Sequence, residues 1–419
     1  MDKTVEALVI GSGPAGMAAA LALKENGINE ILIVEREDAP GGILLQCIHN
    51  GFGLHRFNEE LTGPEYAERY INLVKDKKIE ILSGTCALDI VDDGDSKKAI
   101  LLSEEKGLLE VSAKVVILAM GCRERNRGNI AIPGTRPAGI MTAGLAQKMV
   151  NKSGYIPGRE IVILGSGDIG LIMARRLTLE GARVKAVVEI QSYPGGLNRN
   201  IVQCLNDFHI PLYLSHTITK ISGDRRISSV EIAPLGESRE PQNEKSFTLA
   251  CDTLLLSVGL IPENELSLKA GVILDKVTGG PVVDSNLMTS VPGIFACGNV
   301  LQVHDLVDWV SEESAYCGKA AASYVRNGLL KGREIPVKPG NMVRYTLPAK
   351  VIAGTEAVIS LRPMAPAQNM SIIAKAGEKI LYKKKEKKIF PSIMLRFPVK
   401  DMPEDAGCIE VFFSAEDKK

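Results

Sequence analysis

Three glycines near the N-terminus form the first pattern in the chain whose residue types and spacing could bind a ligand. Gly11, Gly13 and Gly16 follow an apolar run in the sequence VIGSGPAG. The first permits a tight turn, the second lets the backbone approach a pyrophosphate, and the third brings a helix against a sheet, so that phosphates lie at the positive end of that helix. Glu35 lies 19 residues after Gly16, where a carboxylate accepts hydrogen bonds from an adenosine ribose. The spacing predicts a dinucleotide site.

A second copy of this pattern lies in the middle of the chain. Gly165, Gly167 and Gly170 have the same spacing in VILGSGDIG, and Glu189 again follows the last glycine by 19 residues. A carboxylate at this point bonds a ribose 2′-hydroxyl and repels a 2′-phosphate, which favours NAD(H) over NADP(H). The alternative is a vestigial unit that keeps the fold and binds another adenine nucleotide or nothing.

The elements that position the two patterns form an internal repeat. Each copy is expected to begin with an apolar strand, continue through the glycine turn into a helix, and return in a second strand that ends at the acid. A polar β-meander and an apolar strand that closes on glycine follow in both halves. In the first half these elements are residues 7–10, 14–26, 31–34, 79–90 and 115–121, and in the second half residues 161–164, a helix to about 180, 183–188, 210–221 and 253–259.

The remaining sequence predicts that the first domain is discontinuous and that a smaller third domain follows. Residues 289–299 are typical of a short buried strand, and an amphipathic helix is expected at about 309–327. Beyond them, alternating apolar runs with prolines indicate a small antiparallel β domain, a sandwich in our interpretation. The fold class is therefore α/β, with two Rossmann-like dinucleotide-binding domains. The expected domains are 1–122 with 280–330, 123–279, and 331–419.

The composition argues against several classes of protein. Lys plus Arg and Asp plus Glu both number 50, so no overall field points to nucleic acid or to an anionic membrane. No apolar stretch approaches the ~20 residues that span a bilayer, and the N-terminus lacks a signal-peptide pattern, so we expect a cytoplasmic protein without a membrane span. The eight cysteines form no CxxC, CxxxxC or iron–sulfur spacing, and we expect no metal.

Together, the motifs resemble the two-dinucleotide-domain flavoproteins of the pyridine nucleotide-disulfide oxidoreductase superfamily, particularly the compact branch that includes thioredoxin reductase. The resemblance covers residues 1–330, where GSGPAG, GG, LTGP, AMG, IPG, GLIP and VPGIFACGN stand in the family's order. The segments GGILLQCIHNGFG and GCRERNRGNIAIPGTRPAG, with the C-terminal β domain, look most like the flavoprotein subunits found with glycerol-3-phosphate dehydrogenase-like proteins. The FAD subunits of opine, sarcosine and proline dehydrogenases are similar more distantly.

The resemblance implies FAD on the first unit and a nicotinamide nucleotide on the second. The residues assigned to FAD binding are Gly11, Gly13, Pro14, Ala15, Gly16, Glu35, Arg36, Gly42, Gln46, Ala87, Ala119, Gly121, Gly298, Asn299 and Val310. Those assigned to NAD(H) binding are Gly165, Gly167, Asp168, Ile169, Gly170, Glu189 and Gly259.

Departures from the family and two nearby side chains affect the expected chemistry. The family's redox-active dithiol is absent, which disfavours disulfide reduction. Asn299 stands where the family usually has Asp to hold the ribityl chain, so we expect bound FAD with altered affinity.

Two side chains near the expected flavin site are candidates for a catalytic role. Cys47 could be a peroxide-reducing thiol, and His49 could relay a proton to the flavin. The simpler interpretations are a packing cysteine and a satisfied loop histidine.

These observations predict an FAD-dependent oxidoreductase that exchanges hydride between NAD(H) and the flavin without a redox-active disulfide. The step needs no general base, and backbone amides near Val310 would face the flavin. A stand-alone NADH oxidase or peroxidase, or an electron-transfer subunit with a vestigial NAD domain, is the alternative. Because the chain has no second redox station and carries an 89-residue appendage, we expect a hetero-oligomer. The partner would be another flavoprotein or an iron–sulfur dehydrogenase subunit, of glycerol-3-phosphate type.

Overall fold

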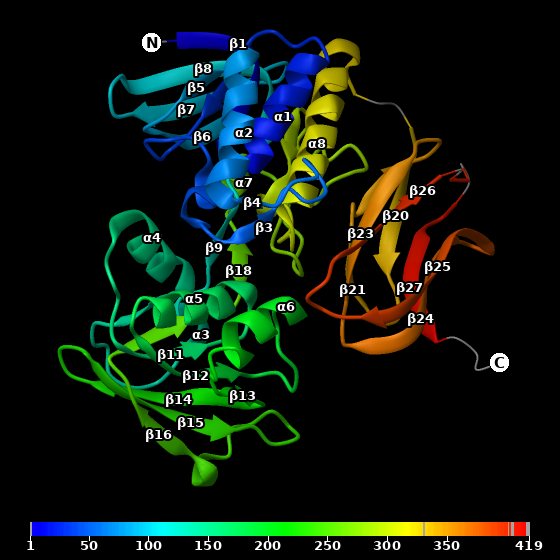
Figure 1. Cartoon of the computed structure of the whole chain (residues 1–419). Coiled ribbons are helices and arrows are strands. Elements are labelled where there is room, and N and C mark those ends of the chain that lie inside the picture. Colours follow the sequence, from blue (N-terminus) through cyan, green and yellow to red (C-terminus); the bar gives the residue numbers. More distant parts are fainter. Residues whose placement is uncertain (1, 330–331, 401, 404–405, 416–419) are drawn as a thin grey trace. The chain divides into compact units, whose positions relative to one another are not determined.

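The chain folds into two compact units. The computed structural model describes residues 2–329, 332–400, 402–403 and 406–415 (Figure 1). One unit is Met1–Cys122 with Pro262–Lys419, and the other is Arg123–Ile261. The chain therefore returns to the first unit at Pro262, earlier than the expected boundary at 279. The reason is a tether at Asn264, whose side-chain amide donates to the carbonyl oxygens of Gly279 and Val300, both at 2.9 Å.

A seven-stranded sheet forms the core of the first unit. Its order is β5-β2-β1-β8-β7-β6, and β19 also pairs with β8. β5, β2, β1, β8 and β19 pair in parallel, whereas β6, β7 and β8 form the antiparallel meander that the sequence indicated. The bounds are β1 (Asp2–Ile10), β2 (Ile31–Val34), β5 (Glu80–Leu82), β6 (Thr85–Asp92), β7 (Lys97–Ser103), β8 (Gly107–Leu118) and β19 (Ile294–Ala296).

Two long helices lie side by side in this unit, α1 (Pro14–Glu25) and α8 (Val307–Asn327) (Figure 1). A Cβ added at Gly318 would lie 2.2 Å from the carbonyl oxygen of Ala19, so the two backbones approach closely. A capping box between Thr62 and Glu65 begins α2 (Gly63–Asp76). The shorter elements are η1 (Gly42–Gln46), β3 (Asn50–Phe52), β4 (Leu61–Thr62), α7 (Glu265–Lys269) and η4 (Gly298–Val300).

The second unit repeats the plan of the first. A parallel sheet in the order β10-β17-β11-β12-β13 is accompanied by an antiparallel sheet of β14, β15 and β16. The predicted strand, helix and strand are β11 (Glu160–Leu164), α5 (Asp168–Leu179) and β12 (Arg183–Glu189). The other bounds are β9 (Cys122–Glu124), α3 (Arg127–Ile130), β10 (Ile140–Thr142), α4 (Ala143–Ser153), α6 (Asn198–Ile201), η2 (Val202–Asn206), β13 (Leu212–Leu214), β14 (His216–Gly223), β15 (Ile227–Pro234), η3 (Asn243–Lys245), β16 (Phe247–Ala250), β17 (Thr253–Leu256) and β18 (Leu260–Pro262).

Two sheets with their own hydrophobic core form the C-terminal β domain. The larger has the order β22-β20-β27-β24-β25 and the smaller β21-β23-β26. The domain is antiparallel as expected, except that β20 and β27 run parallel. They can do so because they begin and end the domain, so no hairpin joins them. The bounds are β20 (Glu334–Pro339), β21 (Val343–Leu347), β22 (Lys350–Ile352), β23 (Ala357–Pro363), β24 (Ala367–Ala376), β25 (Lys379–Ile389), β26 (Leu395–Val399) and β27 (Ile409–Ala415).

Candidate functional site

The glycine turn after β1 has the geometry that its sequence predicts. Gly11 has φ +107°, and a Cβ there would lie 2.5 Å from the carbonyl oxygen of Ala119. A Cβ at Gly16 would lie 1.8 Å from the carbonyl oxygen of Gly11. Neither position accepts a side chain. At Gly13, by contrast, an added Cβ would meet no atom within 4 Å, and α1 begins at the next residue, Pro14. Open space beside a helix N-terminus is what a pyrophosphate requires.

Glu35, at the end of β2, lies beside this turn and is buried. Its Oε2 accepts hydrogen bonds from the backbone N–H and the hydroxyl of Ser12, at 2.9 and 2.7 Å. Its Oε1 accepts from the Glu37 N–H at 2.9 Å. The carboxylate is thus fixed, and its remaining lone pairs can accept from ribose hydroxyls. Arg36 beside it is exposed.

Other predicted flavin-site residues gather at the same edge of the sheet. The Gly41 N–H donates to the Ser12 carbonyl oxygen at 3.0 Å, and a Cβ at Gly42 would lie 3.0 Å from Gly13 Cα. The short helix η1 that starts there ends at buried Gln46. These contacts place Gly42, the first residue of η1, beside the glycine turn.

Gly298 brings three elements together. A Cβ at this position would lie 2.7 Å from Ala15 Cβ and 3.3 Å from Val310 Cγ1, so the end of β19, the start of α1 and the first turns of α8 meet. The predicted amide donor needs correction, because α8 begins at Val307 rather than near 309 and the Val310 N–H donates to the Leu306 carbonyl oxygen at 3.4 Å. The amides that precede Val310 in the helix are the ones that lack an intrahelical acceptor.

Two further predicted residues are placed at the edges of this site. Gly121 has φ +73°, and its carbonyl oxygen accepts from the Glu263 N–H at 3.0 Å. Ala87 lies half-buried in β6, whose first residue, Thr85, donates its N–H to the Glu35 carbonyl oxygen at 2.8 Å.

Asn299 belongs to a buried polar network that the sequence did not reveal. Its Oδ1 accepts from the His304 N–H at 3.0 Å, and its amide donates to Cys122 Sγ at 3.6 Å. His304 Nε2 lies 3.1 Å from the carboxylate of Glu313, which also accepts from the Gly298 N–H at 2.9 Å. Although burial raises the pKa of Glu313, the charge of His304 and these hydrogen bonds hold it below its ordinary value. An acid on the buried face of α8 was the available signal.

Cys47 and His49 lie in the segment after η1. Burial raises the pKa of the Cys47 thiol to about 12, and its Sγ donates to the Ile43 carbonyl oxygen at 3.3 Å. Such a thiol is not nucleophilic near neutral pH. His49 Nδ1 lies 3.1 Å from the Asn50 carbonyl oxygen, and its ring lies 4.9 Å from that of Phe52. These contacts favour the packing interpretation of both residues.

The second unit forms the same cradle. Gly165 has φ +96°, and a Cβ there would lie 2.1 Å from the Ser257 carbonyl oxygen. A Cβ at Gly170 would lie 2.7 Å from Ser257 Cβ. Glu189 Oε2 accepts from the backbone N–H and the hydroxyl of Ser166, at 2.9 and 2.6 Å, as Glu35 does from its serine.

Two more predicted residues of the second unit have structural partners. Asp168 Oδ1 accepts from the Leu197 N–H at 2.8 Å and from the Asn200 amide at 2.6 Å, so it holds the segment after β12. Ile169 packs half-buried against the core of this unit. Gly259 has φ +100° and lies three residues beyond the end of β17, the strand that leads to Ser257 beneath the glycine turn.

The repeat also includes a loop that was not part of the predicted internal repeat. Each glycine, the serine and the acid of the first cradle have a counterpart 154 residues later, and so does the segment Pro40-Gly41-Gly42, repeated at 194–196. The Gly195 N–H donates to the Ser166 hydroxyl at 2.7 Å, so this loop also lies on its glycine turn. The shared GSG and PGG motifs were the signal.

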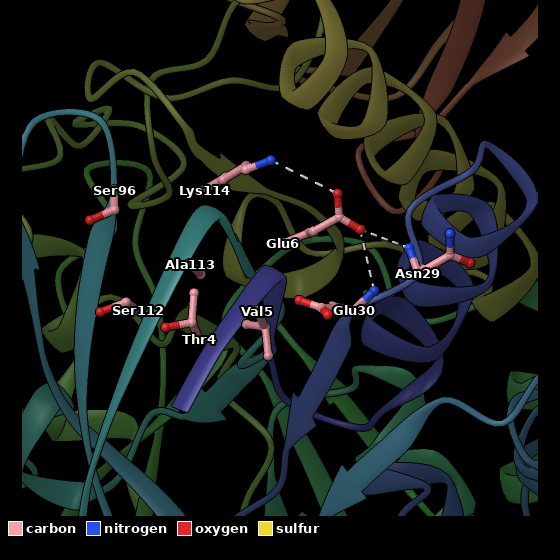
Figure 2. Close-up of a pocket in the computed structure, with 9 residues that line it drawn as sticks. All are labelled: Thr4, Val5, Glu6, Asn29, Glu30, Ser96, Ser112, Ala113 and Lys114. Carbon is pink, nitrogen blue, oxygen red and sulfur yellow. Dashed lines mark hydrogen bonds and ion pairs between the residues drawn. The ribbon is translucent and has the colours of Figure 1, made fainter. Parts of the chain in front are cut away.

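The pocket drawn in Figure 2 belongs to neither cradle. It has a volume of about 390 Å³ and is lined by residues of β1 and β8 and of the segments before β2 and β7. Glu6 accepts from the Asn29 N–H at 2.9 Å and pairs with Lys114 at 4.0 Å. These residues lie where β2 begins, whereas the glycine turn and the acid follow the carboxyl ends of β1 and β2.

Among the described residues, no group of three or more histidines, cysteines or acids is placed to hold a metal ion. Within the same ranges, no helix combines the length and the apolar character needed to cross a membrane.

Comparison with known proteins gives a family and several relatives. The family described as pyridine nucleotide-disulphide oxidoreductase matches residues 5–322. Hydrogen cyanide synthase subunit HcnB of Pseudomonas protegens is 28% identical over 285 residues, which cover 63% of this chain and 58% of HcnB. An opine oxidase subunit of Agrobacterium tumefaciens is 26% identical over 314 residues, which cover 70% of this chain and 60% of that protein. The chain thus spans less than two thirds of either relative.

A solved structure supports the predicted fold. Thioredoxin reductase of T. acidophilum superposes with a TM-score of 0.63 at 21% identity, covering 77% of this chain and 98% of that one. The predicted thioredoxin-reductase-like arrangement of Rossmann-type sheets is therefore confirmed.

Proposed function

Because the chain belongs to the pyridine nucleotide-disulphide oxidoreductase family, whose members are flavin-dependent oxidoreductases, we propose that it exchanges hydride between NAD(H) in its second unit and FAD in its first, without a redox-active disulfide. The observation that carries the proposal is the pair of matching cradles. Each has a tight glycine turn at a helix N-terminus and a buried acid held by a serine. The eight cysteines meanwhile have no dithiol spacing.

The chain's own atoms bind and orient the two dinucleotides. The first amides of α1 and α5 face the phosphates, and Glu35 and Glu189 accept hydrogen bonds from ribose hydroxyls. When bound, FAD supplies the ring that accepts or donates hydride, so no side chain has to act as a general acid or base.

Glu189 supports NAD(H) as the nucleotide of the second unit. Its carboxylate is buried and fixed by Ser166 and Gln191, so it cannot turn away from a 2′-phosphate. A negative charge held there repels that phosphate and bonds a 2′-hydroxyl. The completeness of this cradle argues against a vestigial second unit.

A hetero-oligomer is the assembly that we propose. Two of the relatives are named as subunits, of hydrogen cyanide synthase and of opine oxidase. The chain has no cysteine spacing for an iron–sulfur cluster that could take electrons onward. A partner flavoprotein or iron–sulfur subunit, of glycerol-3-phosphate dehydrogenase type, would exchange electrons with this chain.

A peroxidase that uses Cys47 is the alternative function. The raised pKa of the Cys47 thiol argues against it, because peroxide reduction needs a thiolate.

A matched pair of variants tests the two sites separately. Gly13→Asp and Gly167→Asp each place a negative side chain in one phosphate site. We expect Gly13→Asp to yield colourless protein. Gly167→Asp should stay yellow and lose reduction of the flavin by NADH. Full flavin content in Gly13→Asp would contradict the FAD assignment, and normal NADH reduction in Gly167→Asp would contradict the nucleotide assignment.

A further inference from the structure

The C-terminal β domain contacts the loop that leads from Gly298 to α8. Arg362 of β23 donates from its guanidinium to the Val303 carbonyl oxygen at 2.8 Å and pairs with the carboxylate of Asp305. The two side chains of this pair are only 13% and 16% exposed. Asp305 also accepts from the Met394 N–H at 2.5 Å. One guanidinium nitrogen thus bonds both a carbonyl oxygen and a carboxylate of the loop, and this largely covered, charge-assisted contact fixes the loop in position.

The residue between these two contact points is His304, which connects the loop to the flavin cradle. Its backbone N–H donates to Asn299 Oδ1, and its Nε2 lies 3.1 Å from Glu313. Glu313 accepts from the N–H of Gly298, the residue that lies against α1 and α8. Residues 303–305 are therefore bonded to the β domain through Val303 and Asp305 and to the turn at 298–299 through His304.

A second contact from the same domain meets the first turn of α8. The Arg396 guanidinium lies 5.3 Å from the centre of the Trp309 ring. The same ring stacks with His55 at 4.9 Å. Trp309 precedes Val310, whose side chain lies beside Gly298. The β domain thus holds the cradle at two points, the loop and the helix start.

We propose that the C-terminal β domain is a clamp on the FAD site and that Arg362 is a positioning residue for flavin binding. The proposal rests on the proposed function only in that FAD occupies the first unit. A loop held in its binding conformation before the ligand arrives loses less entropy on binding. The turn at 298–299 is bonded to Glu313 and to Cys122, and Asn299 Oδ1 adds a bond to the loop that Arg362 holds, so the position of that loop bears on the turn. The family match ends at residue 322, before this domain begins.

FAD titration of the full-length apoprotein tests the clamp. Arg362→Met removes both bonds from the guanidinium to the loop, and Asp305→Asn removes its charged partner. We expect each to raise the Kd for FAD at least tenfold, and the double variant to raise it by less than the product of the two single effects, because both changes break the shared pair of Arg362 and Asp305. Lys375→Met is the matched control, since it removes a cation of the same domain whose partner is Glu410. Its Kd for FAD should match that of the wild type.

Melting of the apoproteins separates a clamp from a purely structural role. If Arg362→Met melts lower but binds FAD within twofold of wild type, the proposal is overturned. If Arg362→Met does not fold, the FAD titration is made with Asp305→Asn and Arg362→Lys instead. A Kd for FAD near the wild-type value in both of these variants would overturn the clamp. Wild-type apoprotein that binds no FAD would instead reject the proposed function.

Discussion

Substitution of Glu189 by Gln changes the nucleotide site while leaving its shape intact. Oε2 of Glu189 accepts from the Ser166 N–H at 2.9 Å, and Oε1 accepts from the Gln191 N–H at 2.8 Å. Both oxygens therefore face backbone donors. A glutamine has one oxygen and one amino group, so in either flip its amino group faces an N–H. The variant loses the charge and gains an unfavourable donor pair.

The expected loss of NADH affinity follows from these contacts. A hydrogen bond to a charged group contributes about 1.5–3 kcal/mol, so weakening the bond to the ribose raises the Kd for NADH by about 10- to 150-fold. Removing the charge also removes the repulsion of a 2′-phosphate. Binding of NADPH therefore weakens less, and the preference for NADH falls.

Flavin reduction at subsaturating NADH and NADPH, followed by absorbance in a stopped-flow instrument, measures both effects. Glu35→Gln is the matched control, because Glu35 makes the same contacts with Ser12 and Glu37 in the first unit. It should lower the affinity for FAD. The ratio of the flavin reduction rates with NADH and with NADPH should stay unchanged for the protein that keeps its FAD. If Glu189→Gln kept both the Kd for NADH and that ratio within twofold of wild type, the role of Glu189 would be refuted.

Variants at three other positions test separate parts of the structure. Cys47→Ser should keep full flavin reduction by NADH, because a thiol with a pKa of about 12 takes no part near neutral pH, and loss of reduction with FAD still bound would contradict this. Glu313 contributes stability above the ordinary carboxyl pKa that is lost as the pH falls through its lowered pKa. Glu313→Gln should therefore lower the free energy of unfolding by about 3–5 kcal/mol at pH 7, measured with denaturant, and flatten the acid dependence. Gly318→Ala should destabilise by about 1–3 kcal/mol, since its Cβ would lie 2.2 Å from the Ala19 carbonyl oxygen, and an unchanged melting temperature would rule out that close approach.

Local signals in the sequence were sufficient for both cradles. The spacing of Gly11, Gly13 and Gly16 with Glu35 predicted a turn, a helix and an acid that the structure brings together. These motifs can be recognised in a sequence because Gly11 and Gly16 avoid clashes with backbone close by in the chain or in a neighbouring strand, while Gly13 leaves space open for a pyrophosphate. The repeat of PGG was equally local and was missed, although it lies on the glycine turn in both units.

The sequence was less informative about the ends of elements and about which amides are free. α8 begins two residues earlier than expected, which moved the free amides away from Val310. The chain also rejoins the first unit at Pro262, because the tether at Asn264 reaches partners 15 and 36 residues away. Helix starts and domain boundaries depend on such distant hydrogen bonds.

The residue pattern alone was enough to predict two dinucleotide cradles, the acid in each, the missing dithiol spacing and a β domain at the C-terminus. The contact of Arg362 with Asp305, and the link from this pair through His304 and Glu313 to Gly298, became visible in the folded chain. The physical reason is that a buried polar group must find a partner wherever the fold supplies one. The spacing of residues 298, 304, 313 and 362 along the chain does not predict that these residues contact one another.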